Sequence, residues 1–310
     1  MADARQPCLL FVSCIGAAPK YFMQLSADFR QRYRVTPYLF NDVSRLPEML
    51  DIIEPQLPDT PLLIYYEPDW MPYLGEYLDR YEEFLERIPS GIMKISIPQP
   101  GFTPLWPFHC GDPRNADAER RRNRYGMLPF YAYGDTYVLR RLEEGVPPDE
   151  VVASYLAADL AAEVDLDNLL AGTLSMIERQ DRSGTVKVAD YIAGNFRSKM
   201  LFQTINHANN RLNLYMANKV LRLLECRTVP ETVLDTVGEI IERPMPVHPG
   251  VARHFGMSYI DADTRYPVDE INNLTFAEFI RAYAYCADGV INYADALLNN
   301  PMVPLPAPAG

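Results

Sequence analysis

Basic residues and histidines are both scarce in this chain. Its 310 residues include 29 Lys and Arg against 41 Asp and Glu, for a formal net charge of −12, and only four histidines. A wide nucleic-acid interface needs a basic face, so this charge argues against a nucleic-acid partner. The histidines, at positions 109, 207, 248 and 254, have neither H-x-x-x-H nor H-E-x-x-H spacing, and the sequence therefore predicts no metal site.

Long apolar runs and paired cysteines are also missing. No stretch reaches the roughly 18–20 apolar residues of a membrane helix, and the apolar run behind residues 1–6 is too short for a signal peptide. The five cysteines, at positions 8, 14, 110, 226 and 286, are odd in number and form no C-x-x-C pair, which argues against a disulfide framework or a zinc finger. We therefore expect reduced thiols, no membrane span and a cytoplasmic location.

Four short apolar runs do stand out in the first hundred residues, with helical patterns between them. The runs cover residues 8–13, 35–40, 61–66 and 92–97, and the helical patterns cover about 20–33, 44–53 and 73–87. Regular alternation of strand and helix predicts a parallel sheet with crossover helices. The runs are almost continuously apolar, as expected for strands that are covered on both faces.

The second half of the sequence is mainly helical in pattern. It follows a loop rich in Pro, Gly, Trp and Phe over residues 98–113, a length that is often functional. Helices are predicted from Asp149, over about 165–181, over about 209–226, and from Thr275 to about Leu298, where Thr275 and Glu278 fit a capping box. We predict one α/β domain over residues 1–300 with a helical C-terminal half, and a disordered Pro-rich tail over 301–310.

Cys14 lies where the first predicted strand gives way to a helix. In an open parallel sheet, ligands bind outside the carboxyl ends of the strands. A thiol just ahead of a helix N-terminus is also expected to have a lowered pKa, and Gly16 would let the backbone approach a ligand closely. The alternative is a buried structural cysteine, because free cysteines are among the most buried residues.

His207 lies at a second boundary, inside the stretch "FQTINHANNRLNLYMANKVL". A β-leaning segment ends there and a helix follows. A cysteine and a histidine far apart in sequence can meet as nucleophile and base, so Cys14 and His207 are candidate catalytic partners. The alternative for His207 is a helix-capping or core histidine.

A concentrated run of arginines is present in "RNADAERRRNRYG", which contains Arg121 and Arg122. In a chain of net charge −12, such a run is either a solvated helix face or an anion site, because guanidinium groups fork onto phosphates.

Together, four segments resemble the WcbI family of capsular-polysaccharide biosynthesis proteins from Gram-negative bacteria. They are "VSCIG", "ISIPQPGFTPLWPFH", "YAYGDTYVLRRLEEGVPPDEVVASYL" and "FQTINHANNRLNLYMANKVL", within a match from about residue 8 to about residue 270. The resemblance implies a remote variant of the SGNH/GDSL hydrolase fold, a three-layer α/β/α sandwich. It also implies an association with coenzyme A and an acetyl transfer to a capsule sugar, a deoxyheptose.

The resemblance also implies roles for particular residues. Cys14 takes the place of the nucleophilic serine of the wider fold, and His207 is the candidate base. The acid that orients such a histidine sits three residues before it, and that position is Thr204 here, which carries no charge. We therefore name Asp135, in a matched segment, as the candidate acid. The residues we predict to bind coenzyme A are Gly16, Lys20, Arg121, Arg122, Arg197, Lys199 and Asn206.

The reading we favour is an acyltransferase that moves an acetyl group from acetyl-CoA to a hydroxyl of a capsule sugar or its activated precursor. The acetyl group passes either through an acyl-enzyme on Cys14 or directly to the sugar with His207 as general base. The alternatives are a thioesterase or sugar deacetylase on the same scaffold, and a non-catalytic scaffold protein that binds coenzyme A. The sequence leaves the oligomeric state open, a homo-oligomer included.

Overall fold

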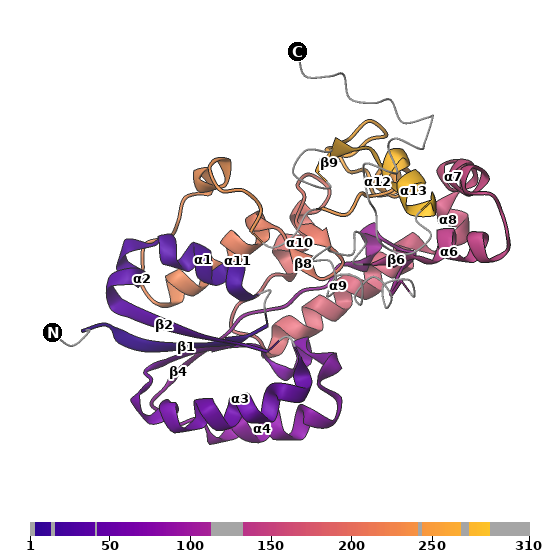
Figure 1. Ribbon diagram of the computed structural model, residues 1–310. Coiled ribbons are helices and arrows are strands. Elements are labelled where there is room, and N and C mark those ends of the chain that lie inside the picture. Colours follow the sequence, from indigo (N-terminus) through magenta and orange to yellow (C-terminus); the bar gives the residue numbers. More distant parts are fainter. Residues whose placement is uncertain are drawn as a thin grey trace, which may run out of the picture. The chain divides into compact units, whose positions relative to one another are not determined.

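The structure is a computed structural model that describes residues 4–13, 16–40, 42–112, 133–240, 244–267 and 273–285. The chain divides into two compact units (Figure 1). Unit 1 consists of residues 1–102 and 171–242, and unit 2 of residues 103–170 and 243–310. The predicted single domain over residues 1–300 stays a prediction, and the tail over 301–310 lies outside the described residues. Among the helices that the structure describes, none is long and apolar enough to cross a membrane.

A four-stranded parallel sheet forms the centre of unit 1, with the strand order β2-β1-β3-β4. The strands are β1 (Gln6–Val12), β2 (Tyr33–Leu39), β3 (Leu62–Tyr65) and β4 (Met93–Ser96). Each overlaps one of the four apolar runs, so the predicted parallel sheet is confirmed. In β1 the five residues from Cys8 to Val12 are all buried, which explains why this run does not alternate between apolar and polar residues.

Helices cover both faces of this sheet (Figure 1). On one face lie α1 (Ala17–Leu25), α2 (Ala27–Arg32) and α11 (Asn210–Leu223). On the other face lie α3 (Leu46–Ile53) and α4 (Leu78–Arg87). The predicted three-layer α/β/α architecture is confirmed, while its likeness to SGNH hydrolases stays a prediction.

An aromatic cluster fills the space between the sheet and the second helical layer. The ring of Phe11 in β1 lies 4.7 Å from that of Phe40, 5.9 Å from Tyr81 and 5.8 Å from Phe84. Tyr81 is fully buried, and its hydroxyl donates a hydrogen bond of 2.7 Å to the carbonyl of Tyr66. The polar end of this large side chain is therefore satisfied inside the core.

Two helices differ from their predicted extents for local backbone reasons. The single helix predicted over residues 20–33 is two helices, because Ser26 is extended (ψ 120°) and separates α1 from α2. The helix predicted over residues 73–87 begins only at Leu78. The preceding turns, η5 (Pro72–Tyr77), are 3-10 in type and contain Gly75 at φ 53°, a left-handed conformation that suits glycine and interrupts an α-helix.

Unit 2 is built from short helices and two small antiparallel strand pairs. The helices are α6 (Thr136–Glu143), α7 (Pro148–Ala157), α8 (Leu160–Glu163), α12 (Pro249–Phe255) and α13 (Phe276–Tyr285). The strand pairs are β5 (His109–Cys110) with β6 (Gly134–Asp135), and β9 (Tyr266–Pro267) with β10 (Asn273–Leu274), both antiparallel.

The remaining predicted helices are confirmed, the last of them as far as Tyr285, and so is the capping box; residues 286–298 lie outside the described residues. The helices are α7, α9 (Leu166–Ser183), α11 and α13. Ahead of α13, the backbone N–H of Thr275 donates 2.8 Å to Glu278 Oε2, and the backbone N–H of Glu278 donates 3.3 Å to Thr275 Oγ1. Two backbone donors at the helix start are satisfied reciprocally.

Candidate active site

The sheet order of unit 1 creates a point where successive connections diverge. From β1 the chain moves through α1 and α2 to β2 on one side, and then returns through α3 to β3 on the other side. Ligands in α/β folds bind at such a switch point, at the carboxyl ends of the strands. Ser13 follows β1 and Tyr66 follows β3, and their hydroxyl oxygens lie 3.5 Å apart.

Cys14 and Ile15 lie outside the described residues, and they are bracketed by Ser13 and Gly16. Gly16 is buried, and its N–H donates 3.0 Å to the Ser13 carbonyl. A Cβ at position 16 would lie 2.3 Å from Val12 Cγ2 and 2.9 Å from the Tyr66 hydroxyl. The turn therefore needs glycine for its own packing, and the predicted contact of Gly16 with a ligand stays a prediction.

Two other cysteines of unit 1 are poor nucleophiles. Burial raises the pKa of the Cys8 thiol to about 12, and burial also raises the pKa of Cys226. Neither thiol is ionised to a useful extent at neutral pH.

His207 projects from a tight hairpin of unit 1. The strands β7 (Phe202–Thr204) and β8 (His207–Ala208) pair antiparallel, with Thr204 opposite His207. Thr204 Oγ1 lies 2.7 Å from His207 Nδ1 and donates a hydrogen bond of 3.2 Å to Asn206 Oδ1. A hydroxyl has one proton to give, so Thr204 accepts from Nδ1–H and His207 Nε2 keeps its lone pair. This is the tautomer of a general base.

Thr204 thus replaces part of what an orienting acid does. Thr204 lies three residues before His207, at the position where the resemblance implies an aspartate, and it holds the imidazole by a hydrogen bond. A neutral hydroxyl fixes orientation and tautomer but contributes no charge to stabilise an imidazolium. The sequence reasoning noted the missing charge and overlooked the hydroxyl.

Buried amides attach the hairpin to α11. The side chain of Asn209 accepts 3.1 Å from Leu212 N–H as the helix cap and donates 2.6 Å to the Met200 carbonyl. Asn213, fully buried, donates 2.9 Å to the carbonyl of Ala208. These bonds fix β8, and His207 with it, on the start of α11. The Asn-rich sequence around His207 carried this signal, which the sequence reasoning did not use.

The segments that precede α1 and α11 lie toward the same end of that helix pair. The two helices pack against each other. The end of α11 lies beside α2, because Arg32 donates 2.6 Å to the Leu224 carbonyl and Arg227 binds the Asp28 carboxylate at 2.9 Å. Since α2 follows α1 directly, α1 and α11 run in the same direction. The approach of Cys14 to His207 stays a prediction.

The predicted coenzyme A ligands that the structure describes are spread over unit 1. Lys20 lies in α1 and is half-buried, and the Arg197 guanidinium lies 4.3 Å from the centre of the Phe196 ring. Lys199 lies in the short segment between α10 (Ala189–Asn195) and β7. Arg121 and Arg122 lie outside the described residues. Their binding roles stay predictions.

Asp135 belongs to unit 2, whereas His207 belongs to unit 1. Its carboxylate caps α6 by accepting 3.1 Å from Val138 N–H, and its other oxygen accepts 2.7 Å from the Tyr155 hydroxyl. Burial raises its pKa to about 6. The carboxylate thus has partners within its own unit, and its predicted pairing with His207 stays a prediction. Among the described residues, no three His, Cys, Asp or Glu side chains cluster as metal ligands would.

Comparisons with known proteins agree on one family. A family model described as polysaccharide biosynthesis enzyme WcbI matches residues 18–228. A solved structure of WcbI, described as a novel polysaccharide biosynthesis enzyme in native form without a disulfide bond between coenzyme A and a cysteine of that protein, has a TM-score of 0.65 at 16% identity. The match covers 89% of this chain and 88% of that one, and at this identity it shows a shared fold. No curated protein sequence matches the chain.

Proposed function

Because the chain belongs to the WcbI family of polysaccharide biosynthesis enzymes, we propose that it is a coenzyme A-dependent O-acetyltransferase. It moves the acetyl group of acetyl-CoA to a hydroxyl of a capsule sugar or its activated precursor. The observation that carries the proposal is the Thr204–His207 hydrogen bond of 2.7 Å. In the tautomer that this bond selects, the lone pair that can accept a proton is on Nε2. Acetyl-CoA is made in the cytoplasm, and we place the reaction there.

The chemistry requires one proton acceptor and one leaving thiolate. The Nε2 lone pair of His207 takes the proton of the sugar hydroxyl as its oxygen attacks the thioester carbonyl carbon. The carbon–sulfur bond then breaks, and the departing thiolate of coenzyme A takes the proton from the imidazolium. In the covalent variant, the Cys14 thiolate attacks first and coenzyme A leaves as its thiolate. The sugar hydroxyl then gives its proton to His207 and attacks the acetyl-cysteine, whose carbon–sulfur bond breaks to return the Cys14 thiolate, and the imidazolium passes the proton to the thiolate of coenzyme A.

Two further observations support coenzyme A as the acetyl donor. The description of the solved WcbI structure names coenzyme A and a cysteine of that protein, and this chain carries Cys14 directly after its first strand. Positive charge is available in unit 1 on Lys20, Arg197 and Lys199, and in the run that contains Arg121 and Arg122. Phosphates of coenzyme A need such groups in a chain of net charge −12.

The test is transfer of labelled acetyl from acetyl-CoA to O-deacetylated capsular polysaccharide or to its sugar precursors. We expect His207→Ala to lower the rate by about 10²- to 10⁴-fold, the usual contribution of a general base. The matched control is His254→Ala, which removes a histidine that pairs with Asp167 in unit 2 and should leave the rate unchanged. Coenzyme A should raise the melting temperature of His207→Ala as it does that of the parent protein.

Three outcomes would overturn the proposal. Acetate release that is equal with and without a sugar acceptor would make the protein a hydrolase. An unchanged rate of acetyl transfer in His207→Ala would show that His207 is not the general base. A melting temperature that neither coenzyme A nor acetyl-CoA changes would show that the protein does not bind the proposed acetyl donor.

Thr204 offers a finer test of how His207 is held. Thr204→Val keeps the shape and removes the hydroxyl, and Thr204→Ser keeps the hydroxyl. Losing one hydrogen bond of about 0.5–1.5 kcal/mol predicts a roughly 2- to 10-fold lower kcat in Thr204→Val, with KM unchanged and Thr204→Ser close to the parent. An equal loss in both variants would assign Thr204 a packing role only.

A further inference from the structure

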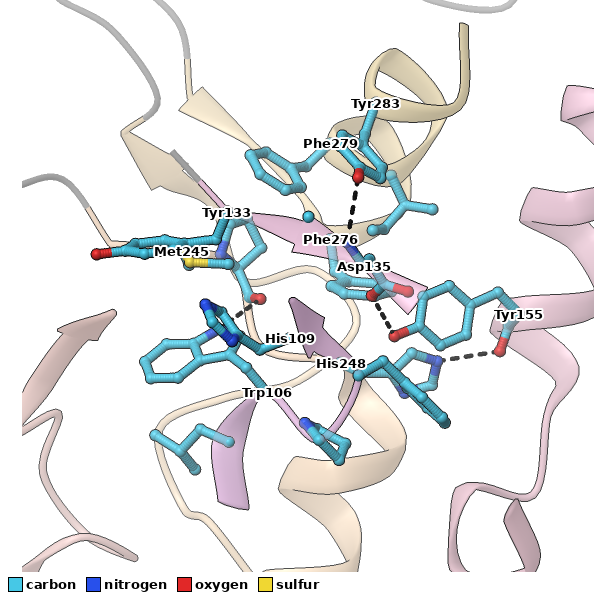
Figure 2. A pocket seen from close by; sticks show the side chains of 16 residues that line it. Trp106, His109, Tyr133, Asp135, Tyr155, Met245, His248, Phe276, Phe279 and Tyr283 are labelled. Atoms are coloured by element: carbon cyan, nitrogen blue, oxygen red, sulfur yellow. Dashed lines mark hydrogen bonds between the residues drawn. The ribbon is translucent and has the colours of Figure 1, made fainter. Parts of the chain in front are cut away.

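Unit 2 contains a pocket of its own, formed entirely by residues of that unit (Figure 2). Its empty volume, open mouth included, is about 450 Å³. The lining is mostly aromatic and apolar, as in small-molecule sites. The lining side chains include Trp106, Phe108, His109, Tyr133, Asp135 and Phe279.

Most polar atoms around this pocket are bonded to other parts of its wall (Figure 2). The Trp106 indole N–H donates 3.1 Å to the Pro246 carbonyl. His248 Nδ1 accepts 2.8 Å from Gly250 N–H, so its Nε2–H donates 3.1 Å to the Tyr155 carbonyl. These bonds hold the aromatic rings in fixed positions, and a preformed wall binds without the entropy cost of ordering it.

His109 has an unused hydrogen-bonding atom in the pocket. Its Nε2 is buried and has no hydrogen-bond partner among the residues that the structure describes. Asp135 lies opposite it in the antiparallel β5–β6 pair, since the two residues are register partners. A buried polar atom without a partner is uncommon in native proteins. Its position on a pocket wall indicates that a ligand supplies the missing bond.

Charge narrows the kind of ligand. Neither lysine nor arginine is among the described residues that line the pocket, so the described part of the wall offers a phosphate or carboxylate no counter-charge and places Asp135 beside it. Burial lowers the pKa of His109, which keeps its imidazole neutral at neutral pH. The described wall therefore favours a ligand without negative charge, with an apolar surface for the rings and at least one polar group for His109.

We propose that this pocket binds a neutral pyranose ring of the polysaccharide or of its precursor, with a C–H face of the sugar against the aromatic walls and its hydroxyls on His109 and Asp135. A hydroxyl both donates and accepts, so it can pair with either tautomer of a neutral imidazole. The identification of the ligand as a sugar rests on the proposed function. A free nucleoside is also neutral and has a flat apolar face, so it is the alternative ligand that the test must distinguish from a sugar.

The two tryptophans of the chain, Trp70 in unit 1 and Trp106 in unit 2, permit a direct test. In the variant Trp70→Phe, all tryptophan fluorescence comes from Trp106 on the pocket wall. We expect methyl hexopyranosides, titrated into this full-length variant to tens of millimolar, to shift that emission in a saturable way. Adenosine at equal concentration should not. This titration contains no acetyl-CoA. A negative result would therefore contradict the sugar site and would not contradict the proposed acetyl transfer, which is tested separately.

Variants then locate the binding. In the Trp70→Phe background, His109→Ala should weaken the sugar by about 3- to 10-fold, the loss expected for one hydrogen bond, and His109→Gln should restore most of it. Phe279→Ala should weaken it as well. The matched controls are His254→Ala, and Tyr285→Ala on the same helix as Phe279. Melting temperatures verify that each variant is folded.

Three results would overturn the proposal. One is the absence of any saturable response to the pyranosides in a folded Trp70→Phe protein. Another is binding of adenosine in their place. The third is sugar binding that His109→Ala and Phe279→Ala leave as strong as their controls do.

Discussion

Replacing Asp135 by asparagine should stabilise the protein at neutral pH. Its carboxylate is buried beside the pocket of unit 2, and burial is the largest cause that raises its pKa, from 3.8 to about 6. The hydrogen bonds from Tyr155 and from the start of α6 lower the pKa and offset only part of this effect. Asparagine is the neutral analogue and keeps an oxygen that can accept from Val138 N–H.

The sign and size follow from proton linkage. Because the folded-state pKa lies above the unfolded value, the folded state binds the proton more tightly between about pH 4 and pH 6. The stability linked to this carboxyl is fully present below the unfolded pKa and is lost as the pH rises through about 6. At about 1.4 kcal/mol per pKa unit, the loss is roughly 3 kcal/mol by neutral pH.

Urea unfolding of the parent protein and Asp135→Asn, at several pH values from about 4 to 7, measures this directly. We expect the free energy of unfolding of Asp135→Asn, relative to the parent, to rise by roughly 3 kcal/mol across that range. Histidines titrate in both proteins, and their contribution largely cancels in the difference.

Asp149→Asn is the matched control in the same unit. A hydrogen bond from Arg281 lowers the pKa of Asp149 below its usual range, so this carboxyl titrates below about pH 4. The free energy of unfolding of Asp149→Asn, relative to the parent, should therefore stay constant from about pH 4 to pH 7. If the free energy of unfolding of Asp135→Asn relative to the parent stays constant or falls between about pH 4 and pH 7, Asp135 is ionised over that whole range. The reasoning from burial would then be refuted.

Three further predictions concern the framework of the two units, each measured by thermal or urea unfolding. Gly16→Ala should destabilise unit 1 by roughly 1–3 kcal/mol, because the new Cβ would lie 2.3 Å from Val12 Cγ2; an unchanged stability would mean that the turn relaxes freely. Phe84→Ala should cost about 3–5 kcal/mol by opening the aromatic cluster between the sheet and α4, and a loss below about 1 kcal/mol would contradict close packing there. Thr275→Ala should cost about 1 kcal/mol by removing one half of the capping box; Thr275→Ser should restore it, and equal losses would point to packing instead.

The centre of the sheet in unit 1 was predictable because its inner strands, β1 and β3, have a simple physical signature. A strand covered on both faces is apolar at consecutive positions, as β1 is from Cys8 to Val12. The divided helix was not predictable, because the amphipathic pattern continues across Ser26 while its backbone turns extended. Periodicity reports which face of a segment is apolar and gives no information on a single backbone angle.

The candidate site was predictable only in part. The position of His207 at an element boundary was visible in the sequence, but the Thr204 hydrogen bond depends on a hairpin register in which the two residues face each other. The pocket of unit 2 could not be predicted at all. Trp106, Asp135, Tyr155, His248 and Phe279 come from five separate segments, and only tertiary packing brings their side chains to one cavity.

The way the chain passes between the two units has a consequence for its synthesis. Unit 1 needs residues 171–242, and the chain makes unit 2's first segment, 103–170, before it reaches them. A nascent chain that has completed β4 therefore carries a finished four-stranded sheet with no α11 to lie beside α1. Its apolar surface stays uncovered while about 114 further residues are made, from the end of β4 at Ser96 to the start of α11 at Asn210, or roughly 6–23 seconds of translation at 5–20 residues per second. During that interval the growing protein presents a natural target for a ribosome-associated chaperone, and a truncation within residues 103–170 would make the exposure permanent.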